Sequence, residues 1–299
     1  MLETRELPPG IEMQTVPCDL CGSDDLSVWD RARANTLTIC NVCGLVFTNP
    51  RIAHSKDKDE HIYTASYFQQ KSRMTEKLQE ARRISYRNEI GVLEQIVSGG
   101  KILDVGCGMG LFLDCFGPGW ERHGCDVSSY GLEEARKRGV TTYHGEFEKM
   151  GLPAAAFDVV YFRASLHHVY APRHCFEKAM HVLRPGGVIV VAMSNNRDGL
   201  CGRLFRGHVR SYEQAHNFLF STDNLMRYMR QSGIEPVRAS YPYFGTGYGN
   251  PVDFVSLPLT YARFLWLNKT GCIGKPSYHD FASPAFPGNY VSVYGRRPL

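Results

Sequence analysis

One segment of this sequence, Lys101–Leu113, restricts the fold more than any other. It begins with an apolar stretch, Lys101–Val105, that predicts a buried β-strand, and glycines follow at positions 106, 108 and 110. Glycine permits a tight turn and lets the backbone approach a neighbouring group closely. We expect a helix from about Leu111. The segment therefore predicts a strand, a glycine turn and a helix, which is the unit that builds parallel sheets.

Strands and helices continue to alternate along most of the chain after this segment. Such alternation favours a doubly wound sheet with helices on both faces. The last strand, Asn289–Gly295, follows a long loop, so we expect it to run antiparallel. The sequence therefore predicts an α/β, Rossmann-like, mostly parallel sheet with an antiparallel last strand. Further strands are expected at Gly119–Asp126, Val140–His144, Phe157–Phe162, Val188–Met193 and Glu235–Ser240, and helices at Ser129–Arg138 and Thr222–Gln231.

Four cysteines near the N-terminus form two closely spaced pairs, Cys18-x2-Cys21 and Cys40-x2-Cys43. Four thiolates can fill the tetrahedral coordination of zinc, and two of them three positions apart can bind from one tight turn. Because all four positions would come from protein, we expect a structural zinc ion rather than a catalytic one. A module of about 50 residues also has too small a core to be stable without such support.

Composition excludes several classes of protein. Hydrophobic residues make up 43% of the chain and charged residues 21%, which is ordinary for a globular protein. No stretch approaches the roughly 20 apolar residues that span a bilayer, and Met1–Gln14 lacks the apolar core of a secretion signal. We therefore expect a cytoplasmic protein whose cysteines are reduced. The net charge of +4 is too small to indicate a nucleic-acid partner by itself.

These patterns divide the chain into three regions. Residues 1–50 would form a zinc-ribbon-like module, residues 51–98 a linker and helical segment, and residues 99–299 the domain that contains the sheet. In the middle region a polar connection, with Ser55–Glu60, precedes apolar residues at helical spacing between Ser66 and about Val97. Two insertions in the third region are expected to cap a substrate. They are residues 194–220, which contain several arginines, and residues 241–288, which contain many aromatic residues including Tyr248 and a possible helix at Pro258–Leu267.

The glycine turn has the spacing of a nucleotide-binding loop. The dinucleotide fingerprint needs a glycine at its sixth position, where this chain has Leu111. Asp126 ends the second expected strand, twenty residues after Gly106, where a carboxylate can accept hydrogen bonds from both ribose hydroxyls. The glycines and this acid together predict a nucleotide site, and the acid is compatible with either class of nucleotide.

Later segments favour one family. The glycine turn resembles motif I of the class I S-adenosylmethionine (SAM)-dependent methyltransferases. Gly145–Phe147, Phe157–Val160, Leu166–Val169 and Leu183–Gly187 resemble further segments of that family in the same order. The resemblance covers roughly residues 64–240 and the last strand. The four-cysteine module joined to this core looks like a bacterial subfamily associated with glycan or secondary-metabolite methylation.

The resemblance implies a set of residues that contact SAM. Asp104 and the glycine loop would line its methionine part, Asp126 would hold the ribose, and Glu146 with Phe147 would meet the adenine. Arg163 could contact SAM, an anionic substrate or an ion-pair partner. The implied cofactor-binding residues are Asp104, Gly106, Cys107, Gly108, Gly110, Asp126, Val127, Glu146, Phe147 and Arg163.

Three histidines are candidates for catalysis. A methyl acceptor that reacts through a hydroxyl or an enolisable carbon needs a base, whereas an amine with a lone pair needs none. His167 and His168 follow the fourth expected strand, near the expected methyl position, and His216 lies in the first insertion. Histidine is the natural base near neutral pH. The alternative for each of them is a structural histidine satisfied by hydrogen bonds.

The leading hypothesis is methylation of a small molecule or glycan, at oxygen, by in-line displacement. A second hypothesis is an RNA methyltransferase whose zinc module docks the nucleic acid, and a third is a SAM-binding scaffold without catalysis. The second would use a track of basic residues along the phosphates. Its members would be Lys71, Arg73, Lys77, Arg82, Arg83, Arg87, Arg197, Arg203, Arg206 and Arg210.

Overall fold

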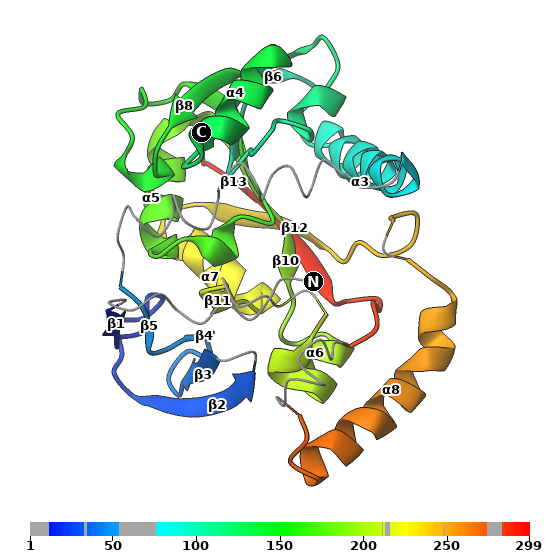
Figure 1. Ribbon diagram of the computed structural model, residues 1–299. Coiled ribbons are helices and arrows are strands. Elements are labelled where there is room, and N and C mark those ends of the chain that lie inside the picture. Colours follow the sequence, from blue (N-terminus) through cyan, green and yellow to red (C-terminus); the bar gives the residue numbers. More distant parts are fainter. Residues whose placement is uncertain are drawn as a thin grey trace.

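The computed structural model describes residues 12–32, 35–53, 76–210, 212, 216–247, 249–273 and 283–299. Its centre is a seven-stranded sheet with the strand order β12-β13-β10-β9-β6-β7-β8 (Figure 1). The strands are β6 (Gly100–Val105), β7 (Trp120–Asp126), β8 (Thr141–His144), β9 (Phe157–Arg163), β10 (Leu183–Asn195), β12 (Glu235–Ser240) and β13 (Tyr290–Arg296).

The pairing directions confirm the predicted sheet. Strand β6 runs parallel to β7 and β9, β7 runs parallel to β8, and β10 runs parallel to β9. The last strand, β13, lies between β10 and β12 and is antiparallel to both. The fold is therefore an α/β, Rossmann-like sheet whose final strand reverses direction, as the sequence predicts.

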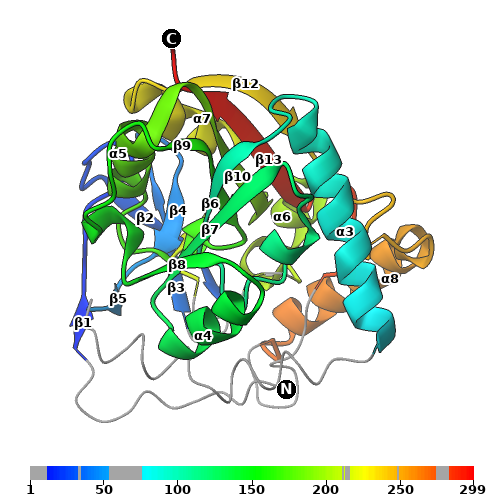
Figure 2. The same ribbon diagram turned by 90° about the horizontal axis from the view of Figure 1, so that it is seen from above.

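Helices cover both faces of the sheet. Alternate residues of a strand point to opposite faces, and in β10 Ile189 and Val191 join one apolar cluster while Val188 and Val190 join another. The first face packs against α5 (Pro172–Val182) and α7 (Thr222–Gln231), and the second against α3 (Glu76–Glu94) and α4 (Ser129–Lys137). Figure 2 shows α3 and α5 on opposite sides of the strands.

One predicted helix is wrong. The expected helix from about Leu111 is replaced by loops and one short 3-10 turn, η1 (Leu113–Cys115). The chain reaches Gly117–Gly119, a Gly-Pro-Gly sequence, soon after this turn. Proline has no N–H for a helical hydrogen bond and glycine is a poor helix former, so too few residues remain for a regular helix between β6 and β7.

The N-terminal ribbon shares its sheet with the rest of the chain. Its strands β2 (Leu26–Ala32), β3 (Asn35–Cys40) and β4 (Val46–Thr48) form an antiparallel sheet, to which the later strand β11 (Phe218–Leu219) is added beside β4. Two short strands, β1 (Met13–Gln14) and β5 (Arg51–Ile52), pair nearby. Leu20, Leu45 and Phe47 of the ribbon belong to the same buried cluster as Phe162 of β9. The ribbon is therefore packed on the sheet rather than separate from it.

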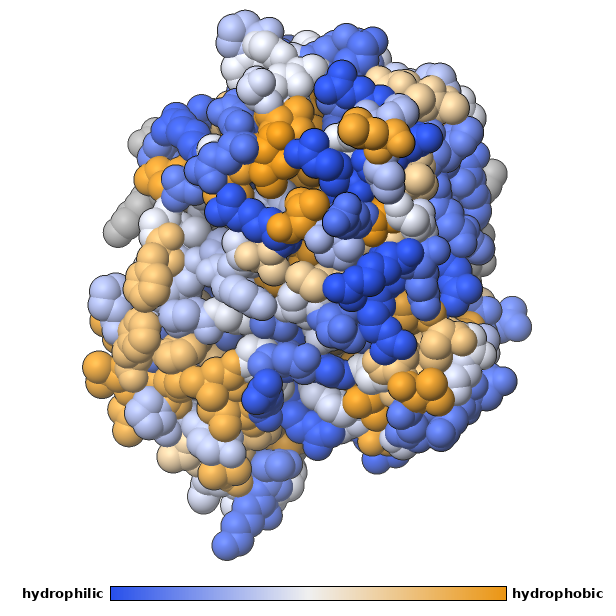
Figure 3. All heavy atoms as spheres, turned by 180° about the vertical axis from the view of Figure 1, so that it is seen from behind, coloured by the Kyte–Doolittle hydropathy of each residue, from blue (hydrophilic) through white to orange (hydrophobic). Residues whose placement is uncertain are grey.

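A third layer lies beside the ribbon. It consists of α6 (Leu200–Phe205), the 3-10 turn η4 (Arg206–His208) and α8 (Val252–Lys269). Residues of α6 and α8 share an apolar cluster with Leu37 and Val46. Helix α8 includes the predicted helix at Pro258–Leu267. Its outer face carries exposed apolar side chains, among them Val255 and Leu259, and the helix lies at the lower left of the view in Figure 3, where apolar side chains gather.

Some predictions fall on residues outside the described ranges. These are the polar connection at Ser55–Glu60, the first part of the expected helix at residues 66–75 with Lys71 and Arg73, and Tyr248. The side chain of Lys77 also lies outside the description. Among the helices that are described, none has both the length and the apolar character needed to cross a membrane.

Candidate active site

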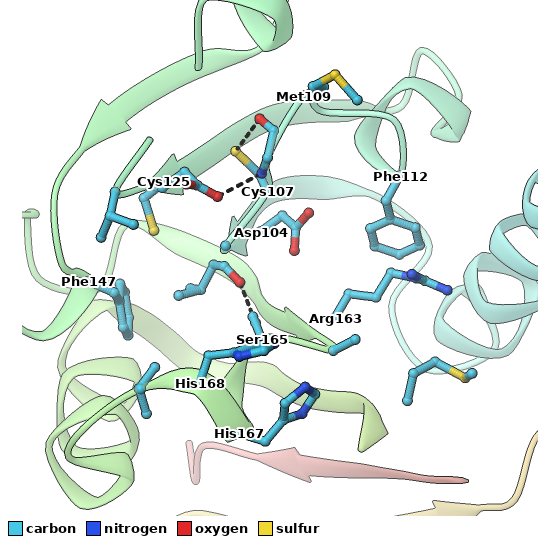
Figure 4. Close-up of a pocket in the computed structure, with 18 of the residues that line it drawn as sticks. Asp104, Cys107, Met109, Phe112, Cys125, Phe147, Arg163, Ser165, His167 and His168 are labelled. Carbon is cyan, nitrogen blue, oxygen red and sulfur yellow. Dashed lines mark hydrogen bonds between the residues drawn. The ribbon is translucent and has the colours of Figure 1, made fainter. Parts of the chain in front are cut away.

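A cavity of about 530 Å³ opens at the carboxyl ends of β6, β7, β9 and β10. This edge is where ligands bind in open α/β sheets. Figure 4 shows Phe147 and Phe112 at opposite ends of the cavity, with Asp104 and Ser165 between them. The candidate catalytic residues His167, His168 and His216 all line it, and so do all the implied cofactor-binding residues except Gly110. These are Asp104, Gly106, Cys107, Gly108, Asp126, Val127, Glu146, Phe147 and Arg163.

The glycine loop after β6 leaves little space for a side chain at Gly106 and Gly110. Gly106, Gly108 and Gly110 all have positive φ angles, of 78°, 51° and 73°. Residues other than glycine rarely adopt such angles. A Cβ on Gly106 would lie 2.7 Å from the Cβ of Ser165, and one on Gly110 would lie 3.0 Å from the Cβ of Ala135. The loop therefore needs glycine for its backbone angles and for space, and Gly110 serves packing beneath the cavity.

Asp126 is oriented by backbone donors. Its Oδ2 accepts a 2.8 Å hydrogen bond from the N–H of Gly108, and its Oδ1 accepts one of 2.8 Å from the N–H of Ser128. Ser128 in turn caps the N-terminus of α4, where its side chain accepts from the N–H of Gly131. The carboxylate is thus fixed at the cavity wall, beside the glycine loop and at the end of β7.

Asp104 is the second-last residue of β6 and is buried. Only 2% of the residue is exposed, and its Oδ1 has no hydrogen-bond partner. Burial raises the pKa of the carboxyl to about 8, against the attraction of Arg163, which lowers it. An acidic group that lines a cavity with an unsatisfied oxygen is suited to a cationic ligand, because such a ligand would stabilise the ionised form.

Arg163 forms a buried ion pair with α3. Its Nε and Nη2 donate to the two carboxylate oxygens of Glu89 at 3.0 and 2.8 Å, and the guanidinium lies 4.3 Å from the ring centroid of Tyr86. The two charged side chains are 14% and 6% exposed. The sequence leaves three partners open for Arg163, namely SAM, an anionic substrate and an ion-pair partner, and the structure contains the ion pair. Arg163 also lines the cavity.

Glu146 and Phe147 follow β8 at the end of the cavity expected to hold adenine. Phe147 begins the 3-10 turn η2 (Phe147–Lys149), is 3% exposed, and packs edge-on against Phe162 with ring centroids 5.6 Å apart. Glu146 accepts a 2.8 Å hydrogen bond from the amino group of Lys149. One side of the cavity is therefore apolar and the adjacent edge carries a carboxylate.

The three candidate histidines form a cluster. His167 and His168 belong to the 3-10 turn η3 (Leu166–His168) after β9, and His216 precedes β11. Their ring centroids lie 4.1 to 4.6 Å apart. Burial lowers the pKa of His167 well below its usual value, and the nearby His168 lowers it further. Figure 4 shows His167 and His168 along the lower edge of the cavity.

Sequence reasoning missed several residues of the cavity. Tyr86 comes from α3, and Met193 and Asn195 come from the end of β10. Two of the missed residues, Ala164 and Met193, have positive φ angles of 50° and 55°. Non-glycine residues in this region carry backbone strain, which is common at functional sites. No sequence pattern marks these positions, because neither an alanine nor a methionine indicates a positive φ angle.

The four cysteines of the ribbon meet in one cluster. The Sγ atoms of Cys18 and Cys43 are 3.3 Å apart, and those of Cys21 and Cys40 are 3.5 Å apart. A zinc tetrahedron with Zn–S bonds of about 2.3 Å has S···S edges of about 3.8 Å. In both turns a glycine N–H, of Gly22 or Gly44, donates to the carbonyl of the first cysteine. The donor set and spacing fit a tetrahedral zinc ion.

Comparisons with known proteins agree with this geometry. A family model described as a methyltransferase domain matches residues 103–191, which include the glycine loop, β7 to β9 and most of β10. Trans-aconitate 2-methyltransferase of Acidovorax ebreus is 36% identical over 206 residues, which cover 66% of this chain and 76% of that protein. The 27-O-demethylrifamycin SV methyltransferase of Amycolatopsis mediterranei is 28% identical over 155 residues, covering 48% of this chain and 56% of that protein.

A solved structure shows the same fold. It is a SAM-dependent methyltransferase of Thermotoga maritima, described as a possible histamine N-methyltransferase. Its TM-score is 0.52 at 21% identity, and the alignment covers 73% of this chain and 91% of that one. The sheet order, the loop at its carboxyl edge and the relative of 36% identity lead to one assignment. The chain belongs to the class I SAM-dependent methyltransferases.

Proposed function

We propose that this enzyme transfers the methyl group of SAM to an oxygen atom of a small molecule or glycan. The observation that carries the proposal is the cavity, in which the glycine loop with Asp126 and the three clustered histidines border the same space. Relatives support a small acceptor: one is named for trans-aconitate and another for an oxygen of a rifamycin. An oxygen acceptor also gives the histidine cluster a task, which an amine acceptor does not require.

The cofactor would bind along the loop and the ends of β7 and β8. Asp126 would accept hydrogen bonds from the ribose hydroxyls, Phe147 would pack against the adenine, and Glu146 would accept from its amino group. Asp104 would face the cationic methionine part. SAM supplies a methyl group on a sulfonium, which is already a strong electrophile, so the enzyme mainly needs to align the acceptor.

The acceptor would enter on the side of the histidines. His167, His168 and His216 border the cavity together with Asn195 and Arg210, so the acceptor side carries polar and cationic groups. Such groups suit a hydroxylated or anionic acceptor. A nearby imidazole would accept the proton that the acceptor hydroxyl loses during in-line displacement.

The four-cysteine module would serve stability. We propose that Cys18, Cys21, Cys40 and Cys43 hold a structural zinc ion. Helices α5 and α7 bind the two cysteine turns, because Arg173 donates to the carbonyl of Leu20 at 3.0 Å and Asn224 donates to the carbonyl of Cys43 at 3.2 Å. A module whose cysteine turns face the catalytic domain in this way supports that domain and is less suited to docking a separate nucleic acid.

Two arginines of the basic track that RNA binding would require already have partners within the protein. Arg197 donates to the carbonyl of Gly44 and pairs with Asp198, and Arg206 lies over the ring of Trp29. RNA methylation therefore stays the second hypothesis. It predicts strong retention on a polyanion column, and elution at low salt would contradict it.

The proposed function is tested in two steps. Calorimetry should show binding of S-adenosylhomocysteine (SAH), and absence of binding would contradict cofactor use. Release of SAH should then be measured with matched acceptors that differ in one atom, such as a phenol and the corresponding aniline, or a sugar and its amino sugar. Turnover of the oxygen member alone supports the proposal. Turnover of only the nitrogen member would contradict it.

A further inference from the structure

The three histidines of the cavity satisfy the geometric requirements of a metal site. One ring nitrogen from each of His167, His168 and His216 lies within 4.8 Å of the other two. Zn–N bonds of about 2.0–2.1 Å in a tetrahedron imply N···N separations of about 3.4 Å. Small rotations of the three side chains would therefore bring the nitrogens to coordination distance.

The backbone of the cluster is held in place by hydrogen bonds from other segments. The N–H of Asn217 donates to the carbonyl of His167 at 2.8 Å, and its side-chain amide donates to the carbonyl of His168 at 2.7 Å. Thr48 of the ribbon donates to the carbonyl of His216 at 2.9 Å. These hydrogen bonds fix the backbone of the three histidines. They do not account for the orientation of the imidazole rings.

Ring environments in the cluster point to a ligand. The Nδ1 atom of His167 is buried and has no hydrogen-bond partner, although a buried polar atom without a partner is costly. The side-chain amide nitrogen of Asn195 lies 3.3 Å from Nδ1 of His216. A histidine that binds a metal through one ring nitrogen donates the N–H of the other to an acceptor, so metal binding through Nε2 of His216 requires the amide of Asn195 to turn its oxygen toward Nδ1. A cation would satisfy the ring of His167.

We propose that His167, His168 and His216 bind one divalent transition-metal ion in the cavity. Imidazole nitrogens favour ions such as Zn²⁺, Co²⁺ and Ni²⁺ over Mg²⁺ or Ca²⁺, which prefer oxygen ligands. Three protein ligands leave a fourth position open, as in catalytic rather than structural zinc sites. All three histidines border the cavity, so that position is available to a ligand within it.

This site refines the proposed function and rests on it for the nature of the acceptor. An acceptor hydroxyl at the open position would have a lowered pKa, because a divalent cation stabilises the oxygen anion. Its proton would pass to water, and the three imidazoles would act as ligands instead of one of them acting as the base. The ion would also fix the acceptor oxygen in the cavity, so the site would contribute to orientation as well as to deprotonation.

The test must separate this site from the four-cysteine site. Co²⁺ serves as the probe, because thiolate ligands give it intense charge-transfer absorption and imidazole ligands do not. The full chain should bind two equivalents, one with and one without that absorption. His168→Gln and His216→Ala should each weaken the second equivalent by about 100-fold or more, and His181→Gln, which changes an exposed histidine on α5, should leave it unchanged.

Several outcomes would overturn the proposal. One is a chain that binds a single equivalent of Co²⁺, and another is a second equivalent that both cluster variants retain at the original affinity. Thermal unfolding identifies a variant that fails to fold, and His168→Gln, whose residue is only half-buried, is the safer substitution. SAH affinity is measured on the same samples. If SAH binds and the second Co²⁺ does not, the metal site alone is refuted, whereas absence of SAH binding refutes the proposed function.

Discussion

The four-cysteine site and the cavity of the same chain are built in opposite ways. The cysteines come from two short turns of one ribbon, and three of them are buried while the fourth is half-buried. Together they offer a closed set of four sulfur donors. The cavity takes side chains from the ends of five strands and from α3, and it is open to a ligand. This difference predicts that changes at the first site act on stability and that most changes at the second act on binding.

The largest effect is expected from Cys18→Ser. Structural zinc contributes apparent binding free energies of about 10–16 kcal/mol in small zinc modules, and that energy is folding energy. The variant should lose its zinc, and the ribbon should unfold. Because Thr48 of β4 holds the backbone of His216, methyl transfer should also fall.

Metal analysis and thermal unfolding measure this outcome. The control is Cys272→Ser, which changes a half-buried thiol outside the ribbon and should retain both zinc and melting temperature. A Cys18→Ser protein with one zinc ion per chain and an unchanged melting temperature would show that the module does not depend on the metal.

The second prediction concerns the buried ion pair of Glu89 with Arg163, a residue that lines the cavity. Glu89→Gln removes one partner of the buried ion pair and leaves Arg163 with a buried, uncompensated charge. Such changes destabilise proteins by about 3–5 kcal/mol. Denaturant unfolding should therefore show a large loss of stability for this variant, although its partner Arg163 lines the cavity.

A matched control exists on the same helix. Glu80 pairs with Arg87 on α3 at 3.4 Å, and both side chains are more than half exposed. Glu80→Gln should change stability by less than about 1 kcal/mol, because exposed ion pairs contribute little. Equal losses in Glu89→Gln and Glu80→Gln would mean that burial of the Glu89–Arg163 pair has no energetic consequence.

The third prediction concerns the affinity for SAH. Asp126→Asn keeps the shape of the side chain and removes the charge that strengthens hydrogen bonds to ribose hydroxyls. It also turns an amide NH2 group toward the N–H of Gly108 or Ser128, so thermal unfolding is measured on the same samples. Hydrogen bonds to charged groups contribute about 1.5–3 kcal/mol, so SAH affinity should fall by about 10- to 100-fold. Titration calorimetry measures the affinity, and Asp114→Asn, which changes an acid outside the cavity lining, serves as the control. Unchanged SAH affinity in Asp126→Asn would refute the placement of the ribose.

The same contrast explains what the sequence can predict. The cysteine pairs are three residues apart and the glycine loop is one continuous segment, so their geometry follows from local chain angles. Asp126 is predictable because it ends the strand that follows the loop. The absence of a helix after Leu111 is also predictable from the sequence, because the Gly-Pro-Gly segment at Gly117–Gly119 leaves too few residues for one.

Contacts between distant segments are not predictable in this way. Glu89 meets Arg163 only because α3 packs across the second face of the sheet. His216 joins His167 because β11 pairs with β4 of the ribbon, which returns the chain to the end of β9. The sequence identifies all three histidines as candidate catalytic residues. Their contact in the folded protein depends on how the ribbon packs against the sheet.

The smallest effect is a change in pH dependence. Burial raises the pKa of Asp104 from 3.8 to about 8, so between these values the folded protein holds a proton that the unfolded chain releases. Stability from this group is therefore complete below about pH 4 and is lost as the pH rises toward 8, with a slope of up to about 1.4 kcal/mol per pH unit.

Asp104→Asn cannot ionise, and its free energy of unfolding should fall less than that of the unmodified protein between pH 6 and pH 7. Denaturant unfolding at both pH values measures the difference, and Asp114→Asn, on an exposed acid, should retain the original dependence. Parallel pH profiles for Asp104→Asn and the unmodified protein would mean that Asp104 is already ionised in the folded state, and the cavity would then carry a fixed negative charge before any cofactor enters.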